Sequence, residues 1–209
     1  MPAKATGGKF IVLDGPEGSG KSTQVDRLAR RLAEAGIATV CVRDPGGTPV
    51  GERIRDVLLH ADLPDMDPLT EMFLYMASRT EMVDGVIRPA LDAGRMVIAD
   101  RFISSTIVYQ GYAGGIDPEE ILRAGRLACR DTWPDLVVLL DLPAAEGFKR
   151  INRQHDRMER KGPAFHERVA EGFRRLAGDD PEHHVLVDAA GSVDEVAARV
   201  WKAVERVVC

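Results

Sequence analysis

The sequence has few cysteines and no excess of positive charge, and both shortages narrow the class of protein to which it belongs. Its three cysteines, Cys41, Cys129 and Cys209, are odd in number and lack the spacing of metal ligands. They favour a reducing cytoplasm. Acidic residues outnumber basic ones by 33 to 28, which gives a formal net charge of −5. Nucleic acid is therefore not expected as a partner, because binding to a phosphate backbone usually needs a basic face.

Long apolar runs are also missing. Residues 1–8 contain Lys4 but no apolar core, and no long apolar run follows. Neither a signal peptide nor a membrane span is expected, so we predict no membrane partner and a cytoplasmic location. The sequence shows no internal repeat, linker or low-complexity segment. Its 209 residues are 44% hydrophobic and 29% charged, and they predict one domain, residues 1–209, with a sizeable core.

What the sequence does contain is a glycine-rich turn between an apolar run and a helix. Residues 9–14 predict a buried strand, and the glycines, lysine and serine that follow have the spacing of a P-loop. The glycines let backbone N–H groups approach nucleotide phosphates, Lys21 reaches the outer oxygens, and the Ser22 hydroxyl can bind Mg²⁺. The predicted nucleotide-binding residues are Gly15, Pro16, Glu17, Gly18, Ser19, Gly20, Lys21, Ser22 and Thr23.

Strands and helices alternate along the rest of the chain. Further strands are predicted at 37–42, 96–100, 136–141 and 185–187. Helices are predicted at 22–35, 50–60, 69–93 with a kink or break near Pro89, 102–112, 118–129, from Pro143 toward the basic segment 150–161, 164–177 and 192–207. The alternation predicts an α/β, P-loop NTPase three-layer fold with a central parallel five-stranded sheet and helices on both faces. Ligands of such a sheet bind above the carboxyl ends of the strands.

Two carboxylates compete for the metal. Asp100 and Asp141 each end an apolar strand, where a P-loop enzyme keeps the acid that helps to hold Mg²⁺. Asp100 is followed at once by Arg101, which can neutralise phosphate charge. We therefore predict Ser22 and Asp100 as the metal residues and Asp141 as a strand-end cap or structural acid.

Several motifs together resemble one family, the thymidylate kinases of bacterial type. Its signature is matched by Asp100-Arg101-Phe102 with Ser105-Thr106 and Tyr109-Gln110, its REPGGT corner by residues 43–48, its F-x-A-x-R helix by residues 73–79, and its lid by residues 156–159 with Phe165 and Arg168-Val169. The resemblance covers most of the chain. It implies a homodimeric cytoplasmic kinase that phosphorylates dTMP to dTDP with ATP as co-substrate and Mg²⁺ as cofactor.

The resemblance also implies roles for particular residues. The implied acceptor-binding set is Glu17, Arg55, Tyr75, Arg79, Arg101, Ser105, Thr106 and Tyr109. Within it, Glu17 accepts from the sugar 3′-hydroxyl and Arg55 contacts the 5′-monophosphate. Ser105, Thr106 and Tyr109 contact the thymine edge and crowd the sugar C2′, although such hydroxyls are as often helix caps. Asp44 departs from the glutamate usual in the family, so it is assigned no metal contact.

Tyr75 and Arg79 are four residues apart and share a helix face, so a ring that stacks on a pyrimidine and a guanidinium that donates to its O4 could act together. As an isolated pair they would more simply be a core aromatic beside a surface arginine.

A basic segment at about 150–162 is the predicted lid. Arg150, Arg153, Arg157 and Arg160 are separated by three, four and three residues, so in a helix they would share one face. Because Gly18 follows Glu17, the P-loop carries no arginine there, and the resemblance implies that lid arginines take over. The predicted catalytic residues are Lys21, Arg101, Arg153 and Arg157. The alternative is a solvated basic face, partly neutralised by Asp156 and Glu159.

Two other functions remain open at this point. A kinase of another small acceptor, such as dUMP, CMP or a deoxynucleoside, would share the P-loop but differ in how Tyr75, Arg79 and Thr106 meet the base. A P-loop switch or regulatory ATPase would hydrolyse nucleotide regardless of dTMP. It would leave Glu17 and the row of arginines without a purpose.

Overall fold

The computed structural model describes residues 8–60, 63 and 66–208, so Cys209 lies outside the described residues. Its centre is one sheet of five parallel strands in the order β2-β3-β1-β4-β5. The strands are β1 (Phe10–Asp14), β2 (Thr39–Arg43), β3 (Met96–Asp100), β4 (Leu136–Asp141) and β5 (His184–Asp188). The predicted five-stranded parallel sheet is thus confirmed. No helix in the described part of the chain is long and apolar enough to cross a membrane.

Strand β1 occupies the middle of the sheet, and every one of its residues is buried. Leu13 pairs with Asp100 of β3 on one side, and Asp14 pairs with Leu139 of β4 on the other. The P-loop leaves the carboxyl end of β1, so it emerges between the ends of β3 and β4. This topology places Asp100 and Arg101 beside the P-loop, although some 80 residues separate them in sequence.

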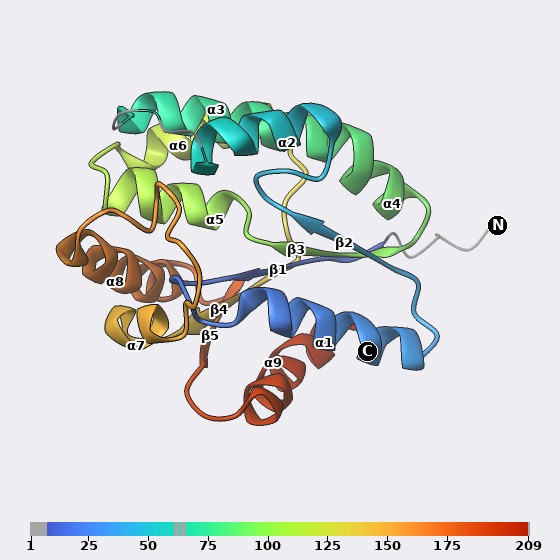
Figure 1. Cartoon of the computed structure of the whole chain (residues 1–209). Helices are drawn as coiled ribbons and strands as arrows, with labels where there is room; N and C mark the ends of the chain where they lie inside the picture. The colour runs from blue at the N-terminus through green and yellow to red at the C-terminus, as the bar shows by residue number, and fades with distance from the viewer. Residues whose placement is uncertain (1–7, 61–62, 64–65, 209) are drawn as a thin grey trace.

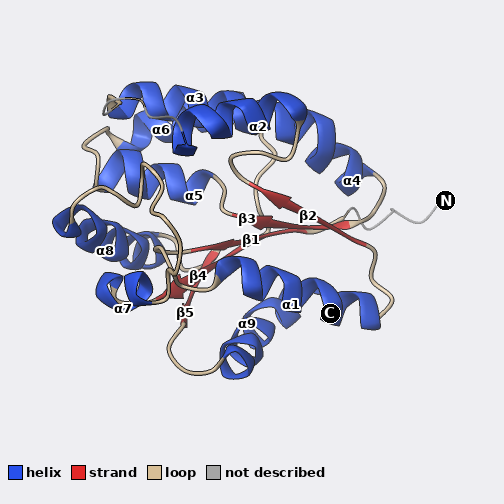
Figure 2. Ribbon diagram, in the orientation of Figure 1, coloured by secondary structure: helices blue, strands red, loops and turns tan. Residues whose placement is uncertain are grey.

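Helices cover both faces of the sheet, which makes three layers (Figures 1 and 2). Side chains alternate between the faces because successive strand residues point to opposite sides. Ile11 and Leu13 pack with α1 (Lys21–Glu34) and α9 (Val193–Val208). Phe10 and Val12 pack in the other core. That core is covered by α3 (Pro68–Met82), α6 (Pro118–Cys129) and α8 (Pro163–Asp179).

The remaining helices are short or irregular. They are α2 (Pro49–Arg55), α4 (Arg88–Asp92), α5 (Ile103–Thr106), α7 (Ala144–Lys149) and the wide π turns at Asp56–His60, Val83–Ile87 and Ile107–Tyr112. The long helix predicted at 69–93 is therefore α3, a π turn and α4. Pro89 stands in the first turn of α4 and lacks the N–H of a regular helix, so the predicted break lies just before it.

The helix predicted from Pro143 toward the basic segment is α7, but the basic segment itself is not helical. Helix α7 ends at Lys149, and residues 151–162 form turns and loop up to α8. Side chains there bond to backbone N–H groups locally, since Asp156 and Glu159 accept from each other's amides at 2.9 and 3.0 Å. The 3-4-3 spacing of the arginines consequently does not place them on one face.

Candidate active site

A cleft of about 1050 Å³ opens at the carboxyl ends of the strands. Its walls come from the P-loop, the corner after β2, α3, the segment after β3, the lid and the loop before α9. Most of the predicted site residues line it, namely Glu17, Gly18, Ser19, Gly20, Lys21, Ser22, Thr23, Arg55, Tyr75, Arg79, Asp100, Arg101, Ser105, Thr106, Tyr109 and Arg153. Gly15, Pro16 and Arg157 are not among the lining residues.

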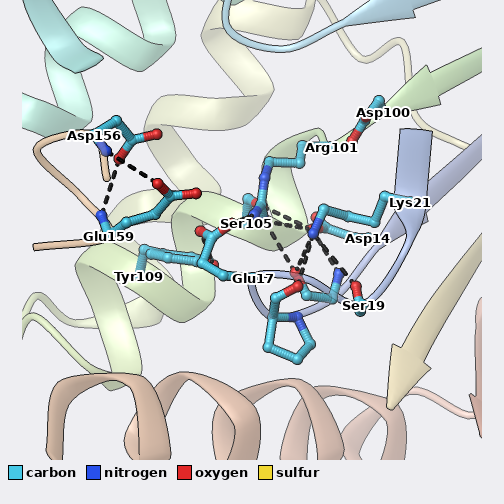
Figure 3. A network of polar contacts seen from close by, with 12 residues as sticks. Asp14, Glu17, Ser19, Lys21, Asp100, Arg101, Ser105, Tyr109, Asp156 and Glu159 are labelled. Atoms are coloured by element: carbon cyan, nitrogen blue, oxygen red, sulfur yellow. Dashed lines mark hydrogen bonds and ion pairs between the residues drawn. The ribbon is translucent and has the colours of Figure 1, made fainter. Parts of the chain in front are cut away.

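Lys21 is buried at the start of α1, and its side chain turns back over the P-loop (Figure 3). Its ammonium donates to the carbonyl oxygens of Pro16 at 2.8 Å and Gly15 at 3.1 Å. Burial and the nearby charge of Arg101 lower the pKa of Lys21 to about 8, despite the carboxylates around it. The loop therefore holds a charged group in position at the cleft floor at neutral pH.

The close contact between the P-loop and α7 explains why the loop has no arginine after Glu17. Gly18 has φ 68°, in the region that favours glycine. A Cβ at Gly18 would overlap the backbone of Gly147 in α7, and a Cβ at Gly147 would overlap the carbonyl of Glu17. No side chain fits at position 18, so this position cannot supply a cation to the P-loop.

Asp14 and Arg101 form a buried ion pair beneath the loop. The Asp14 carboxylate is fully buried and accepts from the Gly15 amide at 2.8 Å, from Ser104 at 2.6 Å and from Ser105 at 2.8 Å. Arg101 Nη1 donates to Asp14 at 3.2 Å and to the Gly15 carbonyl at 3.0 Å. Arg101 also has φ 71°, a conformation that costs about 1–3 kcal/mol and persists where surrounding contacts impose it.

Glu17 joins the P-loop to the segment after β3. Its carboxylate accepts from Arg101 Nη2 at 2.8 Å and from the Tyr109 hydroxyl at 2.7 Å. Figure 3 shows Arg101 and Tyr109 pointing toward Glu17. Burial alone would raise the pKa of Glu17, but the charges of Arg101 and Lys21 and the Tyr109 hydrogen bond lower it to about 2. The Glu17 carboxylate inside the P-loop is therefore ionised, and the charges of Arg101 and Lys21 balance it.

Ser22 and Asp100 meet at the N-terminus of α1. The Ser22 hydroxyl donates to Asp100 Oδ2 at 2.5 Å, so two hard oxygen atoms lie side by side next to the P-loop. Within the described residues, no group of three or more His, Cys, Asp or Glu side chains could hold a metal ion. This pair fits Mg²⁺, which uses one or two protein oxygens together with waters and substrate phosphates. Asp141 is paired with Arg174 at 2.9 Å instead.

Arg79 is buried at the back of the cleft, so it is not the surface arginine of the simpler alternative. Its Nε donates to Asp44 at 2.6 Å, and its Nη2 donates to Thr106 at 3.0 Å. Asp44 is equally buried, and its other oxygen has no hydrogen-bond partner among the residues that the structure describes. Asp44 and Thr106 together fix the plane of the guanidinium. The shorter carboxylate at position 44 thus has a clear contact, to Arg79.

Arg55 and Tyr75 complete this end of the cleft. Arg55 Nη1 donates to the carbonyl of Pro45 at 2.8 Å, so the corner after β2 holds it. Tyr75 lies one helical turn before Arg79 on α3 and lines the same cleft. Burial, with the nearby charge of Glu71, raises the pKa of Tyr75, so its hydroxyl stays neutral.

The two lid arginines that the sequence predicts as catalytic have different surroundings. Arg153 is exposed over 60% of its side chain and forms a bidentate pair with Glu159 at 2.6 and 2.7 Å. Arg157 is buried and bonds to Glu71 of α3 at 2.6 Å and to the Leu58 carbonyl at 2.8 Å. Arg157 lines a second pocket with Met66 and Phe165 rather than the main cleft.

The sequence interpretation missed two buried carboxylates. Asp14 ends an apolar strand immediately before Gly15. This is the same signal that singled out Asp100, so Asp14 could have been found. Glu71 precedes Tyr75 and Arg79 by one and two helical turns, and that spacing places all three on one face of α3.

Comparisons with known proteins agree with this geometry. Residues 13–200 match the family model described as thymidylate kinase. A thymidylate kinase of Synechococcus sp. (strain JA-2-3B'a(2-13)) is 46% identical over 196 residues, 94% of each chain. One from Syntrophotalea carbinolica is 42% identical over 200 residues, 92% of this chain and 93% of the other. The crystal structure of thymidylate kinase from Ehrlichia chaffeensis superposes with a TM-score of 0.79 at 33% identity, covering 94% of this chain and 98% of that one. The chain therefore belongs to the thymidylate kinase family.

Proposed function

We propose that Lys21, Arg101 and Arg153 carry the phosphoryl transfer by which this thymidylate kinase phosphorylates dTMP to dTDP. The observation that supports these roles is the position of Glu17. It lies inside the donor-phosphate loop, yet it is bonded to Arg101 and Tyr109 on the acceptor side, at 2.8 and 2.7 Å. One loop of the protein can thus contact both substrates.

The acceptor nucleotide occupies the half of the cleft between α3 and the segment after β3. Tyr75 stacks on the pyrimidine, and Arg79 donates to its O4 from a plane that Asp44 and Thr106 fix. Thr106 acts through Arg79. Ser105 likewise acts through Arg101, from which it accepts at 3.0 Å. Glu17 accepts from the sugar hydroxyl, with Tyr109 holding its carboxylate, and Arg55 contacts the 5′-phosphate.

The donor is ATP, and we propose that it binds as the Mg²⁺ complex. The P-loop amides from Glu17 to Thr23 surround its phosphates at the N-terminus of α1, where the helix dipole favours anions. Ser22 and Asp100 would hold Mg²⁺, directly or through water. When bound, that ion neutralises negative charge on the phosphates. Lys21, which bonds loop carbonyls in this structure, turns its ammonium to the outer phosphate oxygens.

The transfer is a single in-line displacement with no covalent enzyme intermediate. An oxygen of the dTMP phosphate bonds to the γ-phosphorus of ATP, while the bond from that phosphorus to the bridging oxygen breaks and ADP leaves. The protein's part is to hold both phosphates in line and to neutralise the migrating group. Lys21 and Arg101 do this from the floor of the cleft, and Arg153 does it from the lid.

We propose further that residues 1–209 act as one kinase domain, with 150–162 as its lid, in a homodimer in the cytoplasm. Helices α2, α3 and α6 lie together (Figure 1). They expose large apolar side chains, among them Val50, Phe73 and Leu127 at 50, 58 and 84%. Such a patch is typical of a protein interface. Sedimentation of Phe73→Asp should give a monomer, and an unchanged sedimentation coefficient would argue against this interface.

A coupled ADP-release assay over dTMP, dUMP, CMP and no acceptor tests the function. We expect fast release with dTMP only and slow hydrolysis without it, because water reaches the γ-phosphate poorly in a closed cleft. Glu17→Gln should raise the KM for dTMP about tenfold or more, since a charged hydrogen bond is lost, and change the KM for ATP little. The exposed Glu120→Gln in α6 serves as the control. Strong activity on CMP with none on dTMP would overturn the proposal.

A further inference from the structure

Glu71 is a fully buried carboxylate outside the main cleft, and the reaction described above does not use it. It lies on α3 and has no exposed surface. Its oxygens accept from Arg157 Nη1 at 2.6 Å, from Lys161 Nζ at 3.0 and 3.2 Å, and from Gln110 Nε2 at 2.8 Å. Two of these donors come from the lid segment and one comes from the wall of the acceptor site. A buried carboxylate with three side-chain donors is held firmly, because each bond is strong at low local dielectric.

The lid is attached to the body of the protein at this point. Arg157 donates through Nε to the Leu58 carbonyl at 2.8 Å, and its own amide donates to the Leu59 carbonyl at 3.0 Å. Lys161 also lies over the ring of Phe165 at 4.7 Å. Arg157 therefore cannot reach the transferred phosphate without breaking an ion pair and two hydrogen bonds. Arg153, four residues earlier, faces the cleft, and among the described residues its side-chain partners are Glu159 and the Gln154 carbonyl.

The same carboxylate is also connected to the acceptor site. Gln110 follows Tyr109, whose hydroxyl bonds to Glu17. Tyr109 in turn packs against Phe165, with ring centroids 6.2 Å apart. Tyr75, the proposed stacking residue, lies one turn after Glu71 on α3. The contacts of Glu71 thus join the lid to the residues proposed to hold dTMP.

We propose that Glu71 is a positioning residue that, through Arg157 and Lys161, sets the base of the lid so that Arg153 points over the P-loop. Arg157 is then an anchor of the lid and does not touch the phosphates. The inference rests on the proposed role of Arg153. A small displacement of a catalytic group lowers a rate by up to a hundredfold, so loss of the anchor should affect the transfer step and leave ATP binding nearly unchanged.

The test is a double-mutant cycle on the single-turnover rate with saturating dTMP and ATP. We expect Glu71→Gln and Lys161→Met each to slow transfer about tenfold. In an Arg153→Ala background, each should slow it by less than about twofold, because there is no longer an Arg153 to position. Lys161→Arg, which keeps the charge, should restore most of the rate. Glu81→Gln, an exposed glutamate on the same helix, is the matched control.

Lys161 is partly exposed, so its variants keep the test available if Glu71→Gln does not fold. The inference would be overturned if Glu71→Gln or Lys161→Met slowed transfer by the same factor with and without Arg153. It would also be overturned if these variants lowered the melting temperature and left the transfer rate unchanged. If Arg153→Ala itself keeps the full rate, the proposed role of Arg153 has failed instead. These results are distinguishable because the Arg153→Ala rate is measured by itself.

Discussion

The floor of the active site and its lid both supply cations, but they hold them in different ways. On the floor, Lys21 is buried and Arg101 is half-buried among carbonyls and carboxylates, and Arg101 is bonded to Asp14, Glu17 and Ser105 at once. In the lid, Arg153 is largely exposed and paired with Glu159, while Arg157 is fixed to Glu71. Arg101 is therefore preorganised before substrates arrive, whereas Lys21 has to leave the loop carbonyls to take its proposed role. Of the two lid arginines predicted as catalytic, Arg157 is anchored to α3 and Arg153 is exposed toward the cleft.

The largest effect should come from the floor. We expect Lys21→Met to lower the single-turnover rate about 10²–10³-fold, since a fixed cation near the transferred phosphate is lost. The melting temperature should change little, because burial and the charge of Arg101 already disfavour the charged form of Lys21 in the folded protein. Arg31→Met on the same helix α1, away from the cleft, is the control. A transfer rate within tenfold of the wild type would contradict the proposed role of the floor.

Substitutions of the two lid arginines should differ in how strongly they affect the transfer rate and the free energy of unfolding. Arg153→Ala is expected to slow transfer about a hundredfold and to cost about 1 kcal/mol of stability or less, because the arginine is mostly exposed. Arg157→Met should slow transfer only about tenfold but lower the free energy of unfolding by about 3 kcal/mol, because it removes a buried partner of Glu71. Single-turnover kinetics and urea unfolding measure the two quantities.

The opposite pattern, a larger rate loss in Arg157→Met with unchanged stability, would mean that Arg157 leaves its anchor and reaches the phosphates. Lys149→Ala, an exposed cation at the end of α7, controls for the loss of one positive charge near the lid.

The difference between the floor and the lid also explains which parts of the site could be predicted from the sequence. The P-loop, Ser22 and Asp100 were found because a strand end followed by a glycine turn is a local pattern, and parallel pairing then places Asp100 beside the loop. Family membership removed the regulatory ATPase that the P-loop alone had left open. The arrangement of the lid arginines could not be predicted, because the 3-4-3 spacing places them on one face only if the segment is a helix. Bonds from Arg157 to Glu71 and Leu58, 86 and 99 residues away, favour another conformation, and no local pattern encodes them.

The contact of Asp44 with Arg79 could likewise not be predicted from the sequence. The sequence revealed only that its side chain is one methylene shorter than the glutamate usual in the family. Its bond to Arg79 at 2.6 Å depends on how the end of β2 meets α3. Long-range pairs of buried side chains thus carry the information that spacing alone does not.

The smallest predicted effect is a pH dependence of the kcat/KM for ATP. It arises from Lys21 on the floor and not from the arginines of the lid. Because burial and Arg101 lower the pKa of Lys21 to about 8, the free enzyme loses this charge as the pH rises through about 8. The kcat/KM for ATP should then fall, approaching tenfold per pH unit at higher pH, since kcat/KM reports groups of the free enzyme. The ATP and dTMP phosphates are already fully ionised there and add no slope.

Stability should change in the opposite direction over the same range. The unfolded chain keeps its lysine protonated up to about 10.5, so between pH 8 and that value it binds more protons than the folded chain. The free energy of unfolding of the wild type relative to Lys21→Met should therefore increase with pH. Urea unfolding of both proteins at pH 7 and 9.5 measures this difference. Lys21→Arg, whose charge does not titrate here, should show a flat kcat/KM profile, and a profile that falls as in the wild type would assign the titration to another group.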